Sequence, residues 1–334
     1  MIGQDPAIGD PAAPRDAGRR RLLAGLAALL CLPVAGCAPE MPLRVAVQPW
    51  CGYQFLTLAE QEGWLSPQQV ELLRVPLAAD SVAALREGRV DAAALTLDEV
   101  LLLLAQGMSL SVVLVFDVSA GADVLLAKPG IDSLPALAGQ RIGVEDSALG
   151  KIVLASVLEA AGLRREQVTV VPIREDHPGA WGSGALDAIV TYAPSLAKLE
   201  ALGLQRLYSS RDMPRLVMDV LAVRRDRISG RGAALQALTE GHFRALAQWR
   251  RNPIDTGYRL AAILGVEPEA VREIYAGIEL PDALFNLSYL QPPADELRAS
   301  AQAVGAILVN EGLMPAARIP EDLFTGRFLR PPPG

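Results

Sequence analysis

Apolar runs alternate with helix-periodic segments along the chain, in an order that occurs twice. The apolar runs 44–47 and 141–144 lead, through Gly52 and Ser147 respectively, into segments with a helical spacing of apolar residues. Short apolar runs separated by such helical patterns are typical of parallel strands joined by crossover helices. The pattern therefore predicts an α/β fold.

A second pair of segments follows the first pair in the same order. Residues 88–92 and 184–188 both read Gly-x-x-Asp-Ala, and the strands that they open end at Thr96 and Thr191. In each copy the glycine is expected to terminate a helix and Asp-Ala to begin a buried strand. We interpret the repeated order as two similar lobes.

Two crossings between these lobes can be placed from the apolar pattern. The run 110–116 ends the first half, residues 117–123 are expected to carry the chain into the second lobe, and the run 215–223 is expected to carry it back. Helical patterns dominate the remainder of the chain. They span residues 233–250, 253–264, 268–277 and 293–311.

We therefore expect a two-lobed α/β protein in which each lobe is a mostly parallel sheet flanked by helices. Lobe 1 is predicted to comprise residues 42–120 together with the return strand and C-terminal helices of residues 215–330. Lobe 2 is predicted to comprise residues 121–214.

The N-terminal segment has the pattern of an export signal. Three arginines at 19–21 precede fifteen uncharged residues, 22–36, a run too short to span a bilayer as a helix. The last residues before Cys37 read Val-Ala-Gly, which resembles the lipobox of bacterial lipoproteins. The resemblance predicts a signal peptide over residues 1–36, lipidation of Cys37 and a tether over 37–41. A plain signal peptide with an incidental cysteine is the alternative.

Composition narrows the function classes. The chain has 334 residues, is 51% hydrophobic but only 5% aromatic, and carries a net charge of −7. Because no basic block lies outside the N-terminus, nucleic acid is not an expected partner. With Cys37 lipidated, Cys51 has no partner for an intramolecular disulfide. The spacing of His and Cys suggests neither a metal site nor a cofactor.

Several stretches together resemble one known family. It comprises bacterial periplasmic solute-binding proteins of the nitrate, sulfonate and taurine type, which have a type II periplasmic-binding fold. The similar stretches are residues 59–65, 88–99, 117–123, 137–145 and 187–194.

The resemblance implies a monomeric binding protein, without catalysis, that delivers a small polar ligand to the permease and ATPase of an ABC importer. It would be lipid-anchored at the periplasmic face of a bacterial membrane, or on the outer surface of a Gram-positive cell. A periplasmic sensing module is one alternative. An enzyme on the same fold is another, although the Cys-rich metal segment of fungal thiamine-pyrimidine synthases is missing, and the menaquinone-pathway enzymes lack export signals.

Candidate ligand-binding residues in lobe 1 follow from the rule that ligands bind beyond the carboxyl ends of parallel strands. Trp50, Gly52 and Tyr53 follow the first strand, where the aromatic rings offer stacking surfaces with a polar edge. The alternative is an ordinary turn with both rings packed inward. Thr96 ends a strand and is a further candidate, although capping of the next helix also explains it.

The predicted crossing supplies the next candidates: Ser119, Gly121 and Asp123. Small residues allow a ligand to approach the backbone closely, and Ser119 adds a hydroxyl group. A hinge linker without ligand contacts is the alternative.

In lobe 2, Ser147 precedes a helix as Trp50 does in lobe 1, and Thr191 and Tyr192 close the second copy of the Thr-terminated strand. Tyr192 is expected to stack on the ligand or to donate a hydrogen bond to it, unless it is a core residue. Cys51 with His177 is a conceivable nucleophile and base, but no third residue in the sequence orients the pair.

The charge of the ligand is the least determined property. Two helix N-termini facing a cleft favour a small organic anion or a zwitterion, such as a sulfonate. Acidic residues near the predicted cleft oppose this choice, and no arginine is clearly placed among them. They are Asp98, Glu99, Asp123, Glu145, Asp146 and Asp219.

Overall fold

The computed structural model describes residues 1, 3, 41–174, 176–193 and 195–330. All strands among these residues lie between Leu43 and Glu279. The predicted signal peptide, the lipidation site Cys37 and the tether before Met41 lie outside the described residues.

The first sheet has six strands in the order β11-β4-β10-β3-β1-β2. Strand β1 pairs in parallel with β2 and β3, whereas β10 is antiparallel to β3 and β4, and β11 is antiparallel to β4. Four strands therefore run in one direction, and β10 and β11 run against them. The strands are β1 (Leu43–Val47), β2 (Val70–Arg74), β3 (Ala92–Thr96), β4 (Leu110–Ser119), β10 (Met218–Arg224) and β11 (Ile278–Glu279).

The second sheet has five strands in the order β7-β6-β8-β5-β9. Strand β6 pairs in parallel with β7 and β8, and β5 is antiparallel to both of its neighbours. Most strands thus run in one direction in both sheets, and an antiparallel strand lies between two of them, β10 in the first sheet and β5 in the second. The strands are β5 (Val124–Ala127), β6 (Arg141–Glu145), β7 (Thr169–Ile173), β8 (Ala188–Thr191) and β9 (Gln205–Ser209).

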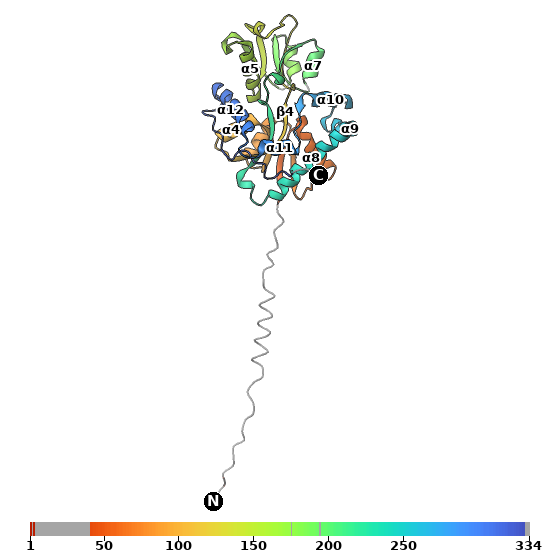
Figure 1. Cartoon of the computed structure of the whole chain (residues 1–334), viewed down its shortest axis with the longest axis vertical. Helices are drawn as coiled ribbons and strands as arrows, with labels where there is room; N and C mark the ends of the chain where they lie inside the picture. Colours follow the sequence, from red (N-terminus) through yellow and green to blue (C-terminus); the bar gives the residue numbers. More distant parts are fainter. Residues whose placement is uncertain (2, 4–40, 175, 194, 331–334) are drawn as a thin grey trace. The chain divides into compact units, whose positions relative to one another are not determined.

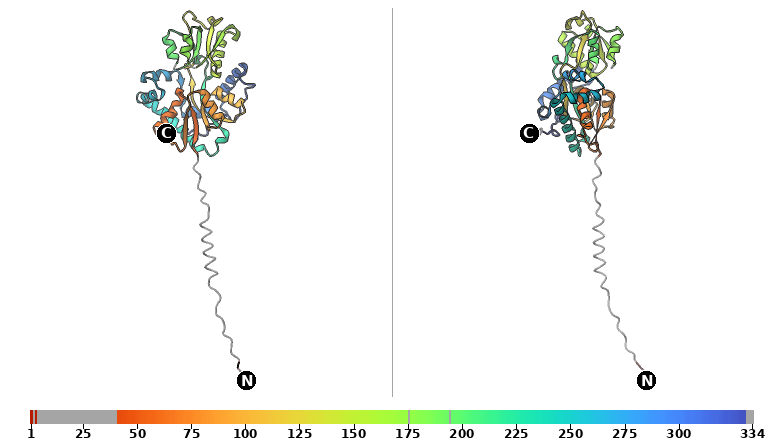
Figure 2. Two further views of the ribbon diagram at one scale, coloured as in Figure 1. Left: turned by 180° about the vertical axis from the view of Figure 1, so that it is seen from behind. Right: turned by 90° about the vertical axis from the view of Figure 1, so that its right-hand side faces the viewer.

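Helices flank both sheets (Figures 1 and 2). Around the first sheet, α2 packs against α8 and α9, and α4 packs against α12. These helices are α2 (Gln54–Gln61), α3 (Ala78–Arg86), α4 (Leu97–Ala105), α8 (Gly232–Arg251), α9 (Pro253–Leu264), α10 (Pro268–Ala276), α11 (Ala283–Leu290) and α12 (Asp295–Asn310).

The second sheet carries α5 (Ala148–Ala161), α6 (His177–Gly182) and α7 (Ser195–Ala201). Single 3₁₀ turns connect other elements. They are η1 (Cys51–Tyr53), η2 (Leu134–Leu137), η3 (Arg165–Gln167), η4 (Ser210–Asp212) and η5 (Arg225–Arg227).

The repeated sequence order corresponds to a repeated hydrogen-bond arrangement. The Arg44 N–H donates to Asp91 Oδ2 at 3.0 Å, and the Arg141 N–H donates to Asp187 Oδ2 at 3.0 Å. In both copies the aspartate N–H returns a hydrogen bond of 2.8 Å to the arginine carbonyl oxygen. Each aspartate therefore fixes the start of β3 or β8 against the first strand of its sheet.

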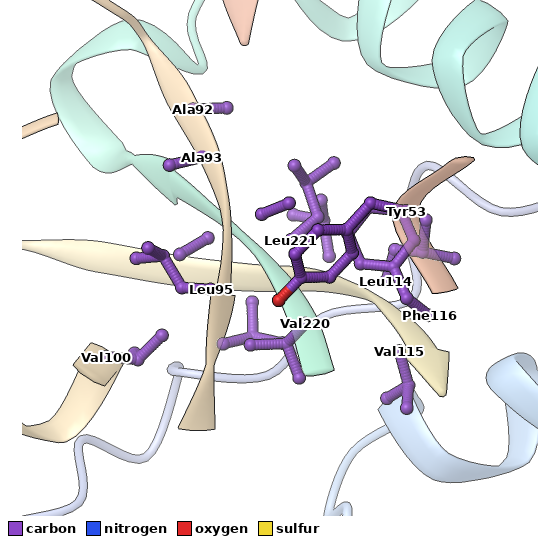
Figure 3. Packing of buried hydrophobic residues seen from close by; sticks show 14 of the residues in the cluster. Tyr53, Ala92, Ala93, Leu95, Val100, Leu114, Val115, Phe116, Val220 and Leu221 are labelled. Atoms are coloured by element: carbon purple, nitrogen blue, oxygen red, sulfur yellow. The ribbon is translucent and has the colours of Figure 1, made fainter. Parts of the chain in front are cut away.

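The larger hydrophobic core lies on the first sheet. The central strands β3, β4 and β10 of this sheet are buried on both faces, as continuous apolar runs require. Figure 3 shows the ring of Tyr53 beside Leu114 and Phe116, above side chains of β10. The Tyr53 and Phe116 rings meet edge to face, with centroids 5.1 Å apart. This packing holds the turn after β1 firmly against the sheet.

The α/β fold class predicted from the sequence is confirmed. The helices expected from periodicity are present within a few residues of their predicted ends, and α11 is an additional helix that the pattern did not indicate. None of the described helices is both long enough and apolar enough to cross a membrane.

Candidate functional site

The candidate site lies at the carboxyl ends of β1, β3 and β4. Three polar residues form a row across the sheet there, because Asp219 on β10 pairs with Thr96 on one side and with Asp117 on the other. Directly opposite residues on neighbouring strands place their side chains on the same face. The row therefore presents three polar groups side by side where this class of fold binds its ligands.

Asp117 and Asp219 are buried carboxyl groups held by aromatic donors. The Trp50 Nε1–H lies 3.2 and 3.3 Å from the two Asp117 carboxylate oxygens, and the Tyr53 hydroxyl donates to Asp219 Oδ1. Burial raises the pKa of Asp117 to about 7, although hydrogen bonds from Asp219 and Trp50 oppose the rise. Burial, followed by the nearby charge of Asp117, raises the pKa of Asp219 well above its usual value.

Gly52 permits this arrangement. A Cβ atom built on Gly52 would overlap the Asp117 carboxylate, so any larger residue would displace it. The ring of Tyr53 is fully buried in the core, and its hydroxyl group contacts the polar row through Asp219. Trp50 is partly exposed and is the aromatic residue of this turn whose surface a ligand can reach.

Thr96 begins α4 and places two further acids beside the row. Its N–H donates to Glu99 Oε2 at 2.9 Å, which caps the helix. Burial raises the pKa of Asp98 to about 6. Burial, reinforced by the charge of Asp98, raises the pKa of Glu99 to about 7.

The crossing from β4 to β5 contains a buried hydrogen-bond network. Ser119 Oγ lies 2.6 Å from Asp123 Oδ2 and 2.7 Å from Ser210 Oγ, and the Gly121 N–H donates to Ser210 Oγ at 2.6 Å. Gly121 has a φ of 119°, which favours glycine. Burial raises the pKa of Asp123 to about 6, although the hydrogen bond from Ser119 lowers it. Side chains therefore tie the first crossing to η4, which precedes the second crossing.

The second lobe contributes a compact polar group. The Tyr192 hydroxyl donates to Glu145 Oε2 at 2.6 Å, and His177 Nδ1 lies 2.9 Å from Thr191 Oγ1. The ring of His177 meets that of Tyr192 edge to face, with a centroid distance of 5.1 Å. Hydrogen bonding with His177 lowers the pKa of Glu145 against the opposing effect of partial burial.

Ser147 has a structural role at the start of α5. Its side chain accepts a hydrogen bond from the Gly150 N–H at 3.1 Å, as an N-cap residue does. This intramolecular cap uses one of the free N–H groups that the sequence suggested for an anionic ligand.

Acidic groups from both lobes act on one another. The charge of Glu145 contributes to the raised pKa of Glu99, which places the two carboxylates within electrostatic range. The site is rich in carboxylates and contains one histidine.

Cys51 is not an activated nucleophile. Cys51 is buried, and desolvation, followed by the charges of Asp117 and Asp219, raises the pKa of its thiol well above the usual value. A thiol that resists ionisation is a poor nucleophile. Among residues 41–330, apart from the undescribed positions 175 and 194, no group of His, Cys, Asp and Glu could hold a metal ion.

Several site residues were not among the candidates chosen from the sequence. Asp117 is the most central of them, and it interrupts a strand that is otherwise nearly all apolar. Charged residues are rarely buried unless they are paired, so this aspartate could have been chosen as a candidate from the sequence. Ser210 and His177 meet Ser119 and Thr191 only through the tertiary fold.

Comparison with solved structures supports the fold. The alkanesulfonate-binding protein SsuA from Xanthomonas axonopodis pv. citri, bound to MOPS, superposes with a TM-score of 0.67 at 19% identity, covering 86% of this chain and 97% of the other. The periplasmic aliphatic sulphonate-binding protein SsuA from Escherichia coli gives a TM-score of 0.71 at 18% identity, covering 86% and 92%. The desulfurization enzyme DSZB gives 0.61 at 17% identity, covering 86% and 98%.

Comparison with curated proteins finds no match. The sequence model described as NMT1/THI5 like matches residues 51–254, which is more than half of the chain and includes the turn after β1 and both crossings. The chain therefore belongs to the NMT1/THI5-like family.

Proposed function

We propose that this protein is an extracytoplasmic solute-binding protein that captures a small polar molecule between its two lobes and delivers it to an ABC importer. The observation that carries the proposal is the gathering of polar side chains from the strand ends of both sheets. Trp50 and Asp117 come from the first, and Glu145 and Tyr192 come from the second. Two crossings between the sheets allow one lobe to close on the other, as in hinge-bending binding proteins.

The structural relatives support a binding role over a catalytic one. Two of them are named as sulfonate-binding proteins, while DSZB is named as an enzyme on the same fold. The buried Cys51 has a raised pKa, and His177 is bonded to Thr191 rather than to a nucleophile. A binding protein requires neither group to be reactive.

We further propose that the protein is exported as a monomer and anchored by lipid on Cys37. Support comes from the basic, apolar and small-residue segments that precede this cysteine. Labelling with radioactive fatty acid tests the anchor, because the wild type should incorporate label and Cys37→Ala should not. Equal labelling of both proteins would contradict it.

Deletion of the gene distinguishes a sensing role of the same binding site from a role in import. Deletion of an importer component abolishes uptake of the ligand, whereas deletion of a sensor component abolishes a response to it. Neighbouring genes for a permease and an ATPase would support import.

Binding itself is tested by a thermal-shift screen of small polar molecules on the exported protein. A ligand that binds only the folded state stabilises it by about 2.7 kcal/mol at a hundredfold excess over its Kd. We expect at least one compound to raise the Tm of the wild type and to have a smaller effect on Trp50→Ala. Tyr258→Ala, which alters an exposed tyrosine on α9, is the matched control. A shift that is equal in both variants would place the ligand elsewhere.

A further inference from the structure

We propose that an apolar contact between the lobes, centred on Ile152 of α5, keeps the free protein in a closed arrangement and thereby sets its affinity for ligand. In this arrangement α5 of lobe 2 contacts α4 and α12 of lobe 1. The effect on affinity rests on the proposed function, whereas the closed arrangement is a property of the free chain.

The first observation is that α5 carries two apolar rows, which belong to different cores. One row packs within a core of the second sheet and comprises Val153, Leu154, Val157 and Leu158. Ile152 instead belongs to the larger core of the first sheet, and Ala148, one turn before it, packs against the same core. Residues four apart lie on one face of a helix, so these two form a row of their own. A single helix thus takes part in the cores of both lobes.

The row on α5 that belongs to the core of lobe 1 is closed to solvent. Ile152 is 0% exposed, and Ser156, the next residue of the row, is 6% exposed. The Ser156 hydroxyl group donates to the Ile152 carbonyl oxygen at 3.0 Å, within its own helix. Both helices that contact α5 from lobe 1 contribute to the larger core, α4 through Leu101 and α12 through Val304. Apolar packing therefore continues across the boundary between the lobes.

A second, independent observation places backbone strain next to the same contact. Among the described residues other than glycine, only Arg215 and Ala294 have a positive φ, of 64° and 55°. Arg215 lies in the second crossing, Ala294 immediately precedes α12, and an ion pair joins Arg215 to Glu296 in the first turn of that helix. Left-handed backbone at such residues persists only where the surrounding structure holds it. The helix that contacts α5 thus also fixes the crossing about which the lobes turn.

The size of the contact suits an equilibrium between two arrangements. Separation of α5 from α4 and α12 would expose the side chain of Ile152 to water. Burial of one such side chain shifts an equilibrium by about tenfold to a hundredfold. A preference of this size makes the closed arrangement the main state of the free protein. A ligand that binds the closed arrangement then binds more tightly, because its affinity is scaled by the population of that state.

The distance between two spin labels tests the closed arrangement without any ligand. Cysteines are introduced for labelling at Glu159 of α5 and at Gln302 of α12, which are both exposed. We expect short distances to predominate in the free protein. Ile152→Ala should populate longer distances, with the equilibrium shifted toward the open arrangement by about tenfold. Val153→Ala, which alters the neighbouring side chain in the core of lobe 2, is the matched control: it should lower the Tm and leave the distances unchanged.

Long distances that predominate in the free protein, or an unchanged distribution in Ile152→Ala, would overturn the proposal. If the Tm shows that Ile152→Ala is not folded, Ile152→Val replaces it. This variant lacks one methyl group and should shift the equilibrium in the same direction by about fourfold.

The effect on affinity is measured with a compound from the thermal-shift screen. It should restore short distances in Ile152→Ala and bind this variant more weakly than the wild type. Equal affinity for the two proteins would contradict the link between the contact and binding. A screen without any hit would instead contradict the proposed function, and the distances in the free protein would still decide whether the lobes are closed.

Discussion

Asp117 on β4 and Asp219 on β10 lie directly opposite each other on antiparallel strands, and both are buried. Like charges in direct opposition destabilise a sheet, and burial of each charge adds to the cost. The protein accommodates the pair with donors from Trp50 and Tyr53 and with raised pKa values. Such a pair reduces stability at neutral pH, which is typical of a residue pair retained for function.

Asp117→Asn should therefore stabilise the unliganded protein at neutral and alkaline pH. The pKa of Asp117 is raised in the folded state to about 7, above its unfolded value of about 4. Stability from this group is complete below pH 4 and is lost as pH rises through 7. We expect a gain of at most about 4 kcal/mol at pH 8, a Tm rise of several degrees, and little gain at pH 4.

Thermal unfolding between pH 4 and 8 measures this effect, with the exposed Asp226→Asn as the control. A Tm below that of the wild type at pH 8 would contradict the proposed cost of the acidic pair.

Ser119→Ala should destabilise the unliganded protein. The Ser119 hydroxyl contacts Asp123 and Ser210, so its removal leaves buried polar atoms with fewer partners. Loss of such contacts costs about 1–3 kcal/mol. Chemical denaturation measures the change, and Ser288→Ala, which alters an exposed serine on α11, is the matched control. An unchanged unfolding free energy would show that the network does not stabilise the crossing.

Gly52→Ala should disrupt the site through one added methyl group. The new Cβ would overlap the Asp117 carboxylate, which must then move away from Trp50. We expect reduced stability and loss of ligand binding, read by thermal shift and tryptophan fluorescence. Gly182→Ala in α6 is the control, because no atom lies within 4 Å of its Cβ position. Equal behaviour of the two variants would refute the close approach.

His242→Leu should improve stability in acid. His242 lies in the core against Phe55 and Phe116, and burial lowers its pKa to about 3. The unfolded histidine takes up a proton near pH 6.5, so stability is present above this pH and is lost as pH falls toward 3. Leucine does not titrate, so the variant lacks this dependence of stability on pH. Chemical denaturation at pH 7 and pH 5 measures the unfolding free energy of both proteins. If the difference between variant and wild type is the same at both pH values, this account is contradicted.

Much of the fold was predictable from the sequence because the order of its elements depends on local patterns. The repeated Gly-x-x-Asp-Ala segments indicated two lobes, and the glycines Gly88 and Gly184 have the positive φ expected at helix ends. The helical spacing of apolar residues indicated the C-terminal helices. The short helix α11 was missed because its apolar and polar residues have no clear helical spacing.

The candidate site was predictable only where local rules apply. Trp50 and Thr96 were found because ligands bind beyond strand ends. The pairing of Asp117 with Asp219 required the register of β4 and β10, which are separated by an entire lobe in the sequence. Burial and its effect on pKa are likewise tertiary properties, which local sequence patterns do not reveal.

Isothermal titration calorimetry with the best compound from the screen tests the central claim, that one small molecule binds between the two lobes. We predict one site per chain and affinity weakened about tenfold or more by Trp50→Ala in lobe 1 and by Thr191→Ala in lobe 2, because each lobe supplies contacts. Tyr258→Ala should bind as the wild type does. Wild-type affinity in either site variant, or more than one ligand per chain, would contradict binding between the lobes.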